Sequence, residues 1–295
     1  MAKTLTRAQK KGDKPKRLNR SAGGDAGIFF FLALFGVIMI FPMVYAISQS
    51  LKPLDELWRF PPRVFVENPT AKNYTDLFRM LGDAWVPFSR YIFNTVFISV
   101  VGTAGNVLFS SLAAYALAKI AFPGRKFFFK IVVYSLMFNS TVTSITNFIV
   151  MSELKMVDTY WAIIVPAWCT TYGLYLMKQF TETSVSDPVL ESARLEGASE
   201  NKIFWKIAIP MLKPAWVTLI IFAFKDLWNS GSSVYVYSEQ LKSLNYAINQ
   251  VVSAGIARAG AAAASTVIMM IVPIIVFVIS QSNVIETMST SGMKD

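Results

Sequence analysis

Histidine is absent from the 295 residues, and cysteine occurs once, as Cys169. The first absence excludes a histidine proton relay, a histidine-ligated metal and a Ser/His/Asp catalytic set. A single cysteine cannot form an intrachain disulfide, and its apolar neighbours predict a small buried side chain. No G-x-x-x-x-G-K-[ST] segment is present to cradle nucleotide phosphates. The sequence predicts no catalytic residues, no metal site and no cofactor in this chain, which is not expected to be an enzyme.

Charge is also scarce. Only 16% of the residues are charged and 54% are hydrophobic, whereas a soluble domain carries about 25% charged residues. The net charge of +10 could indicate nucleic acid, but the basic residues lie beside apolar segments, as in membrane proteins. The first apolar run is too long for a cleaved signal peptide. These features predict an all-α integral membrane protein in contact with a lipid bilayer and no nucleic acid.

Six apolar segments approach the roughly 20 residues that cross a bilayer. The fifth is the weakest, because Lys225, Asp226, Asn229 and Ser230 interrupt it. A reading with five spans stays open. The predicted spans cover about 27–50, 91–118, 127–150, 161–179, 215–237 and 266–283. The predicted domains are a basic tail at 1–26, a transmembrane permease domain at 27–283 with its core at about 91–283, and a tail at 284–295.

The distribution of Lys and Arg predicts the orientation. With the N-terminus inside, 18 of these residues fall on the cytosolic side, nine fall outside and Lys225 lies within a span. This excess favours cytosolic N- and C-termini. The outer segment 51–90 contains five prolines, so we expect it to be extended or in short turns.

A charged segment lies between the fourth and fifth spans and is predicted to form two short helices with a sharp corner. Asp187 and Pro188 can start the first helix, and Gly197 can end it in the left-handed conformation. Ser199 can cap the second helix, which Pro210 and Pro214 are expected to end. An ordinary interfacial amphipathic loop would show the same periodicity.

The spacing in this segment resembles the EAA loop of binding-protein-dependent ABC transporter permeases. The matching positions are Glu191, Ala193, Gly197, Ala198, Phe204 and Pro210, whereas Ser192 replaces the second position of the pattern and Glu196 replaces its usual Asp. Further resemblance to the carbohydrate branch, and to the maltose-type G permease within it, covers about 30–294. It is carried by Pro42, Asn73-Tyr74, Asn94-Thr95, 113–118, 122–124, Trp228-Asn229 and 291–294.

The resemblance implies the type I ABC importer permease fold, with 180–214 as a cytosolic loop that couples to an ATPase. It also implies a heterodimer with a second homologous permease, in a bacterial cytoplasmic membrane. Two cytosolic ABC ATPase subunits would bind ATP and Mg, and an extracytoplasmic solute-binding protein would deliver a sugar or oligosaccharide.

Polar residues within spans are costly in lipid and so indicate a function. One cluster lies in the fifth span, where Asn229 and Ser230 begin a run that forms helix poorly. A second cluster lies in the third span. Hydroxyls and amides can hydrogen-bond a sugar, and an indole can stack on it, although such residues also pack helices together. The candidates for the substrate path are Asn139, Thr143, Asn147, Trp228, Asn229 and Ser230.

Two rival functions are weighed against the permease. An ion-coupled secondary transporter of small solutes would also cross the membrane several times. It usually has two structural repeats and intramembrane carboxylates, whereas only Asp226 lies well inside a span here. A membrane-embedded enzyme would need a catalytic constellation, which the sequence lacks.

Overall fold

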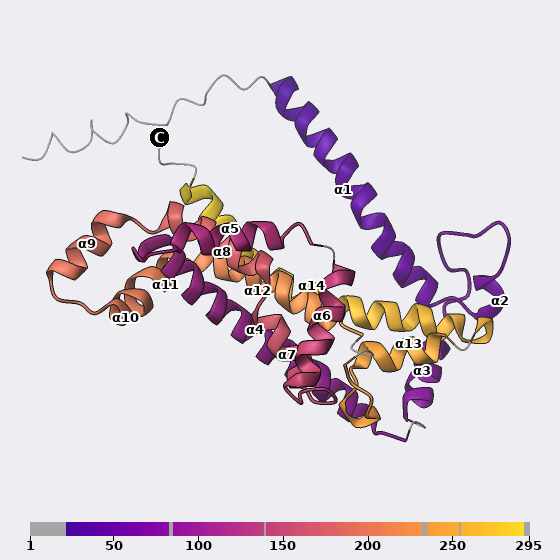
Figure 1. Ribbon diagram of the computed structural model, residues 1–295. Helices are drawn as coiled ribbons and strands as arrows, with labels where there is room; N and C mark the ends of the chain where they lie inside the picture. Colours follow the sequence, from indigo (N-terminus) through magenta and orange to yellow (C-terminus); the bar gives the residue numbers. More distant parts are fainter. Residues whose placement is uncertain (1–21, 83–84, 139, 232–234, 254, 292–295) are drawn as a thin grey trace, which may run out of the picture.

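The computed structural model describes residues 22–82, 85–138, 140–231, 235–253 and 255–291 (Figure 1). These residues form helices, turns and loops, with no strand among them. The expected all-α architecture is therefore confirmed for this part of the chain. The predicted tails fall partly outside it, at 1–21 and 292–295, and so does the path candidate Asn139.

Three helices are each long and apolar enough to cross a bilayer, judged by length and composition. They are α1 (Ala22–Ser50), α4 (Phe88–Lys119) and α14 (Ala259–Ser291). They match the predicted spans at 27–50, 91–118 and 266–283. Both terminal helices are longer than expected, because α1 and α14 extend into residues that the sequence assigned to the tails.

The other three predicted spans are interrupted. Segment 127–150 is divided between two helices, and so is 161–179, which breaks after Trp168. Helix α12 ends at Trp228 and does not reach 237, because Asn229, Ser230 and Gly231 form helix poorly. The helices are α5 (Arg125–Ser135), α6 (Ser140–Glu153), α7 (Trp161–Trp168), α8 (Thr171–Ser184) and α12 (Lys213–Trp228).

Helix α4 is the centre of the bundle and packs against α7, α8 and α12. A glycine allows the closest of these approaches, because a Cβ atom on Gly105 would lie 2.0 Å from Nε1 of Trp168. The Trp168 indole instead lies on the helix and donates a hydrogen bond to the Val101 carbonyl at 3.1 Å. On the other side of the bundle, α14 packs against α12, α1 and α3.

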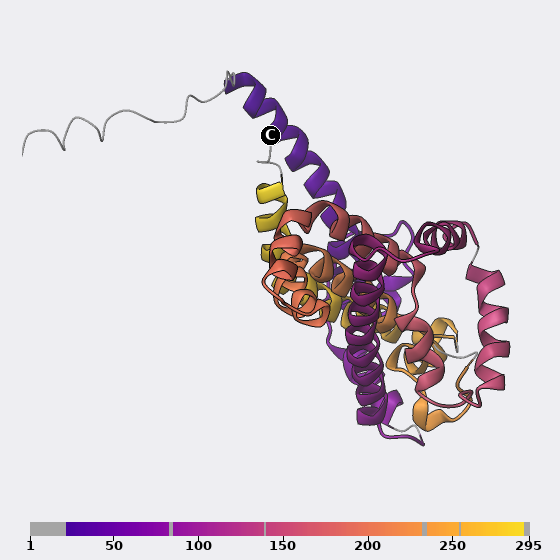
Figure 2. The same ribbon diagram turned by 60° about the vertical axis from the view of Figure 1, so that its left-hand side comes forward.

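Helix α1 projects from the bundle (Figures 1 and 2). Its apolar side chains are exposed along most of its length, and it becomes buried only near its C-terminal end, at Ser48 and Ser50. A helix that is apolar all round is stable in lipid or against another protein rather than in water.

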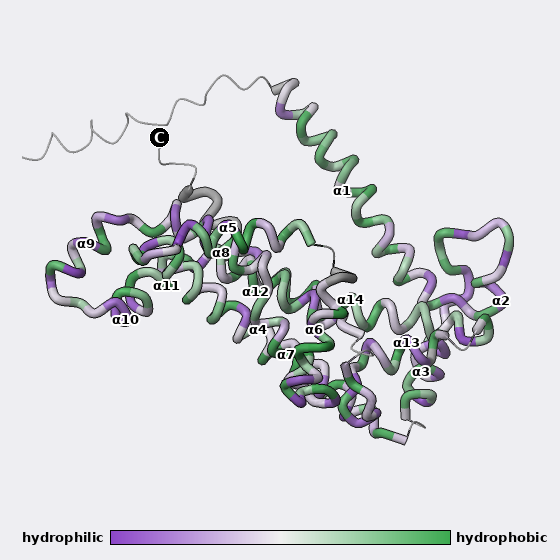
Figure 3. The backbone as a smooth tube through the Cα atoms, in the orientation of Figure 1, coloured by the Kyte–Doolittle hydropathy of each residue, from purple (hydrophilic) through white to green (hydrophobic). Residues whose placement is uncertain are grey.

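Polar residues gather at the two ends of the bundle (Figure 3). One end, called here the loop end, carries α9 (Asp187–Leu195) and α10 (Glu200–Ile203). The opposite end carries α2 (Leu54–Leu57), α3 (Lys72–Gly82) and α13 (Leu244–Val252). Polar ends that flank an apolar body are the arrangement expected of a membrane-spanning bundle.

The expectation of an extended segment at 51–90 is wrong for α3. No proline lies between Pro69 and Pro87, so a helix can form there. Leu77 and Leu81 recur at helical spacing on one face of α3 and are buried in the core beside α13 and α14.

Asparagines that carried the family resemblance hold the opposite end together. Asn94 on α4 is fully buried and donates to the carbonyls of Gln240 and Lys242 at 2.8 and 2.9 Å. Its side-chain oxygen accepts a hydrogen bond from Tyr160 at 2.7 Å. Asn73 donates in the same way to the carbonyls of Ser50, the last residue of α1, and of Lys52 just beyond it. These residues have a structural role, because they satisfy backbone groups of loops.

Candidate functional site

The corner between α9 and α10 is a complete Schellman motif. Gly197 has φ +79°, and its N–H donates to the Arg194 carbonyl at 3.0 Å. The N–H of Ala198 donates to the Ala193 carbonyl, also at 3.0 Å. These two bonds satisfy the last carbonyls of α9. Three residues of the predicted motif, Ala193, Gly197 and Ala198, therefore build the turn itself.

The second helix of the loop starts as predicted and ends between the two prolines that were predicted to end it. The Ser199 hydroxyl accepts from the Lys202 N–H and caps α10. The chain then continues through a π-helical turn, Phe204–Ala208, and α11, Ile209–Met211. The helix therefore ends at Met211, between Pro210 and Pro214 as the sequence predicted, with Pro210 inside its last turn. Pro210 lacks an N–H, and the wider π turn before it is the kind of bulge that accommodates such a missing bond.

A sharp bend follows at Leu212. The axes of Glu200–Met211 and Lys213–Trp228 differ in direction by 76°. Pro214 lies in the first turn of α12, where its missing N–H costs nothing. At this bend the chain leaves the loop and enters α12, which runs in a different direction through the bundle.

An apolar core fixes the loop to the bundle. Leu190, Ile203 and Phe204 are each at most 3% exposed and pack with the last turns of α4 and with α8. The Phe204 ring meets the Tyr115 ring edge to face at 5.4 Å. Burial of such side chains contributes about 1.5–3 kcal/mol each. The loop is thus a rigid extension of α4 and α12.

Two polar contacts connect the loop to α4. Glu200 accepts hydrogen bonds from Arg194 Nε at 2.6 Å and from the Tyr115 hydroxyl at 2.9 Å. The Arg194 bond is the main reason that the pKa of Glu200 lies below its usual range. Lys119 donates to Asp187 at 2.7 Å and lowers the pKa of that carboxyl as well. Sequence reasoning missed Tyr115 and Lys119 because they lie on a different helix.

The outward face of the loop is unusually apolar for a polar end of the molecule. Leu195 is 90% exposed, and Val189 and Trp205 are also exposed. Glu191 lies on this side of α9, is exposed and forms no ion pair within the described residues. A Cβ atom at Gly197 would meet nothing within 4 Å. The space around Gly197 is therefore open in the isolated chain, and its positive φ is the constraint on which residue can stand there.

The polar residues that end the fifth span have divided roles. Trp228 is 5% exposed, and its indole N–H donates to the Met269 carbonyl on α14 at 3.1 Å. Asn229 is exposed, and its amide donates to the Lys225 carbonyl at 2.8 Å. The Ser230 carbonyl accepts from the Ser243 hydroxyl at 2.9 Å. The Trp228 ring is packed between helices and is not free to stack on a sugar in this conformation.

The second predicted cluster lies on α6, away from the first. Thr143 is exposed and Asn147 is half-buried. Helix α6 is held to the segment after α12 by Tyr235, whose hydroxyl donates to the Ser144 carbonyl at 3.3 Å and whose ring stacks on Phe148. The structure therefore does not bring the two clusters into one pocket.

A cavity of about 270 Å³ does open between α4, α7, α8 and α12. Ser230 is the predicted candidate that lines it, and the other polar groups are Asn106, Thr170 and Asp226. The Asn106 amide donates to Thr170 Oγ1 at 2.6 Å, while its own oxygen has no partner among the described groups. Sequence reasoning missed Asn106 and Thr170. The signals that could have found them are an amide in the middle of the span at 91–118 and the two threonines, Thr170 and Thr171, within the span at 161–179.

One smaller expectation needs correction. Cys169 is exposed, because the break between α7 and α8 opens that position, and it is not a buried apolar residue. Adjacent side chains on a helix point in different directions, but the charged atoms of Lys225 and Asp226 lie 3.9 Å apart. Both side chains are more than half exposed, so this contact contributes little on its own.

Comparisons with known proteins agree with this architecture. No family model matches the chain. The chain is 31% identical over 204 residues to the arabinooligosaccharides transport system permease protein AraQ of Halalkalibacterium halodurans, covering 67% of this chain and 70% of the relative. It is 29% identical over 213 residues to the polygalacturonan/rhamnogalacturonan transport system permease protein YtcP of Bacillus subtilis, covering 72% of each.

A solved structure is similar over nearly the whole fold. It is a chain of a bacterial ABC transporter involved in the import of the acidic polysaccharide alginate. The TM-score is 0.73 and the sequence identity 25%, and the match covers 89% of this chain and 98% of the other.

Proposed function

This chain belongs to the permease subunits of ABC transporters that import sugars and oligosaccharides, and from that premise we propose how its parts work. The loop at 187–211 receives the motion of an ATPase, and the bundle lines half of a path for a carbohydrate. The observation that carries this proposal is the rigid, outward-facing loop built from the motif residues.

The two faces of the loop suit a coupling element. Its inner face is fixed by Leu190, Ile203 and Phe204, so a push on the loop moves α4 and α12 with it. Its outer face presents Glu191, Leu195 and the open side of Gly197. An apolar side chain that is 90% exposed is suited to insertion into a partner's pocket. We propose that this partner is one of two cytosolic ABC ATPase subunits, which bind ATP and Mg.

The proposed topology has six spans and cytosolic termini in a bacterial cytoplasmic membrane. The interrupted pairs α5–α6 and α7–α8 supply the third and fourth crossings, and α12 supplies the fifth. The excess of Lys and Arg around the loop end supports this orientation. Broken helices are tolerated at membrane depth where protein covers them or where they line a water-filled cavity.

We assign the substrate path to the cavity beside α12. Asn106, Thr170 and Ser230 supply amide and hydroxyl groups, which suit the hydroxyls of a sugar, and Asp226 adds an acceptor. Asn229 is exposed beside Ser230 in the chain, whereas Trp228 positions the end of α12 through its bond to α14. Thr143 and Asn147 on α6 remain candidates for a separate part of the path.

A heterodimer with a second, homologous permease would complete the path. An extracytoplasmic solute-binding protein would deliver the sugar to the opposite end of the bundle. The relatives named for arabinooligosaccharides and for polygalacturonan/rhamnogalacturonan support a carbohydrate substrate for this chain too.

Reconstitution distinguishes the proposed ATP-driven importer from its rival, an ion-coupled secondary transporter. The chain would be purified with its partner permease and ATPases and placed in proteoliposomes with the binding protein. We expect uptake of a labelled oligosaccharide that requires internal ATP and the binding protein. Uptake driven by an imposed ion gradient without ATP would instead identify a secondary transporter.

A further inference from the structure

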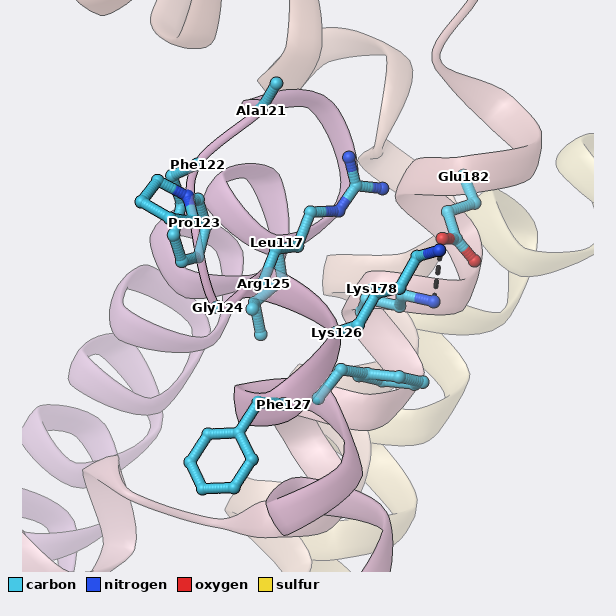
Figure 4. Close-up of a pocket in the computed structure, with 11 residues that line it drawn as sticks. Leu117, Ala121, Phe122, Pro123, Gly124, Arg125, Lys126, Phe127, Lys178 and Glu182 are labelled. Carbon is cyan, nitrogen blue, oxygen red and sulfur yellow. Dashed lines mark ion pairs between the residues drawn. The ribbon is translucent and has the colours of Figure 1, made fainter.

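A basic pocket opens at the loop end, apart from both the coupling loop and the path cavity. It has a volume of about 950 Å³ and lies between the end of α4, the first turn of α5 and α8 (Figure 4). None of its residues is among the predicted coupling or path residues, although Glu182 lies near the start of the predicted coupling loop at 180–214. Its polar lining residues are Arg125, Lys126, Lys178 and Glu182.

The charges of this pocket are unbalanced. Lys178 is 8% exposed and already paired, because its ammonium lies 2.7 Å from Glu182 and 3.8 Å from the centre of the Phe129 ring. Arg125 donates to the Ala118 carbonyl at 2.9 Å but forms no ion pair among the described residues. Lys126 also forms no ion pair with any residue that the structure describes. Three cations against one carboxylate leave the pocket with a net charge of +2.

The backbone adds to this positive potential. Arg125 and Lys126 occupy the first turn of α5, which contains no acidic residue. The residue before the helix is Gly124, at φ +88°, and it offers no side-chain cap. Cations near a helix N-terminus are unfavourable, because the helix dipole is positive there. An anion held by Arg125 and Lys126 would offset this unfavourable interaction with the helix dipole. It would also balance the excess positive charge of the pocket.

The walls of the pocket are apolar, which restricts the anion. Leu117, Phe122, Pro123 and Phe127 line it, and Phe127 is 63% exposed on its rim. A small hydrated anion gains nothing from such walls, whereas the glycerol and upper acyl carbons of a lipid do. The pocket lies where α4 ends and α5 begins, which in the proposed topology is the cytosolic headgroup layer.

We propose that this pocket binds the phosphate headgroup of an anionic phospholipid, with Arg125 and Lys126 contacting the phosphate and Phe127 contacting the glycerol and acyl chain. The inference rests on the proposed membrane topology. Basic pockets between spans on the cytosolic side are a recognised way of holding such headgroups. The Lys178–Glu182 pair on α8 also lines the pocket, and Figure 4 shows the ion pair as a dashed line.

Native mass spectrometry of the assembled transporter tests the site. The complex would be released from nanodiscs that contain phosphatidylglycerol and phosphatidylcholine, and retained lipid would be counted for wild type, Lys126→Gln and Lys130→Gln. Lys130 is the matched control, because it is exposed on the same helix but does not line the pocket. We expect Lys126→Gln to reduce phosphatidylglycerol retention about fivefold, with Lys130→Gln close to wild type. Phosphatidylcholine retention should not differ among the three.

Several results would overturn the inference. Equal phosphatidylglycerol retention by both variants would show that the pocket does not hold the headgroup. Displacement of the lipid by millimolar inorganic phosphate would assign the pocket to a soluble anion. Unchanged lipid retention with loss of ATPase co-purification in Lys126→Gln would assign it to a protein contact. Lipid retention is measured without any transport. The lipid proposal can therefore fail while ATP-dependent uptake persists, and lipid can be retained by a protein that shows no ATP-dependent uptake.

Discussion

At the scale of single residues, Gly197 meets two separate requirements, a backbone conformation with positive φ and an open outward surface. Its φ of +79° favours glycine or asparagine, while the space around it in this chain is open. The backbone conformation can therefore be kept while the outward surface is changed. Such a substitution distinguishes a glycine needed for folding from one needed for contact with a partner.

We predict that Gly197→Asn leaves the subunit folded but weakens ATPase binding, because asparagine tolerates positive φ yet adds bulk to the outer face. Gly197→Ala should instead lower stability by about 1 kcal/mol through backbone strain, with little added bulk. Thermal unfolding in detergent and co-purification of the ATPases measure the two effects. Normal ATPase binding by Gly197→Asn would place this surface outside the contact.

Glu200 gives the loop a defined pH dependence. Its pKa is lowered in the folded state, chiefly by Arg194, from an ordinary value near 4.5. Its contribution to stability is therefore complete above the ordinary pKa and is lost as the pH falls through the lowered folded value. Asp187, whose pKa is lowered by Lys119, acts with the same sign.

We predict that amide exchange at 187–203, corrected for its intrinsic rate, stays constant from pH 7 to about pH 5 and rises only in more acidic solution. Glu200→Gln should weaken the loop's attachment at neutral pH and reduce this acid response, because it removes the charge that Arg194 and Tyr115 bind. An increase in exchange between pH 7 and pH 6 would contradict the assignment, since neither carboxylate titrates there.

At the scale of elements, helix ends matter more than helix centres. The end of α12 at Trp228 and the break between α7 and α8 expose Ser230 and Thr170 to one cavity. In continuous helices, the backbone N–H and C=O groups at these positions would be hydrogen-bonded within the helix, and no polar recess would remain. The break is also why the single cysteine is exposed.

Cysteine accessibility at Asn229, next to Ser230 in the chain, measures whether the end of α12 faces the path. In a Cys169→Ala background, we predict that Asn229→Cys reacts with a small water-soluble thiol reagent. Its rate should change when ATP hydrolysis is trapped, because access to the path alternates with nucleotide state. The control is Phe29→Cys on α1, which is exposed on an apolar helix and should react slowly in every state. Equal, invariant rates at the two positions would remove Asn229 from the path.

At the scale of the whole molecule, the sequence predicted what depends on local pattern. The all-α class, three long helices and the Schellman corner follow from apolar length, from Gly197 and from the Ser199 cap. Helix α3 was missed because prolines on either side of it masked a short amphipathic repeat. The early ends of α12 and α7 depend on local breaks that average hydropathy does not register.

The coupling loop and the cavity were predictable only in part, because many of their contacts join residues that are far apart in the sequence. The motif residues lie close together in sequence, so their spacing reveals the corner. Tyr115, Lys119, Asn106 and Thr170 act on residues from other helices, and only tertiary packing brings them together. Trp228 was placed in the path because of its chemistry, whereas its burial against α14 assigns it to packing.

The central claim is that the loop transmits ATP hydrolysis to the bundle, and charge reversal at its outer face tests this most directly. Oligosaccharide uptake and ATP hydrolysis would be measured in proteoliposomes for Glu191→Lys and for Glu153→Lys, which changes another exposed carboxylate, at the end of α6. We predict that Glu191→Lys reduces uptake more than about tenfold while assembly with the partner permease is kept, and that Glu153→Lys transports normally. Wild-type uptake by Glu191→Lys, with uptake per ATP unchanged, would contradict the account.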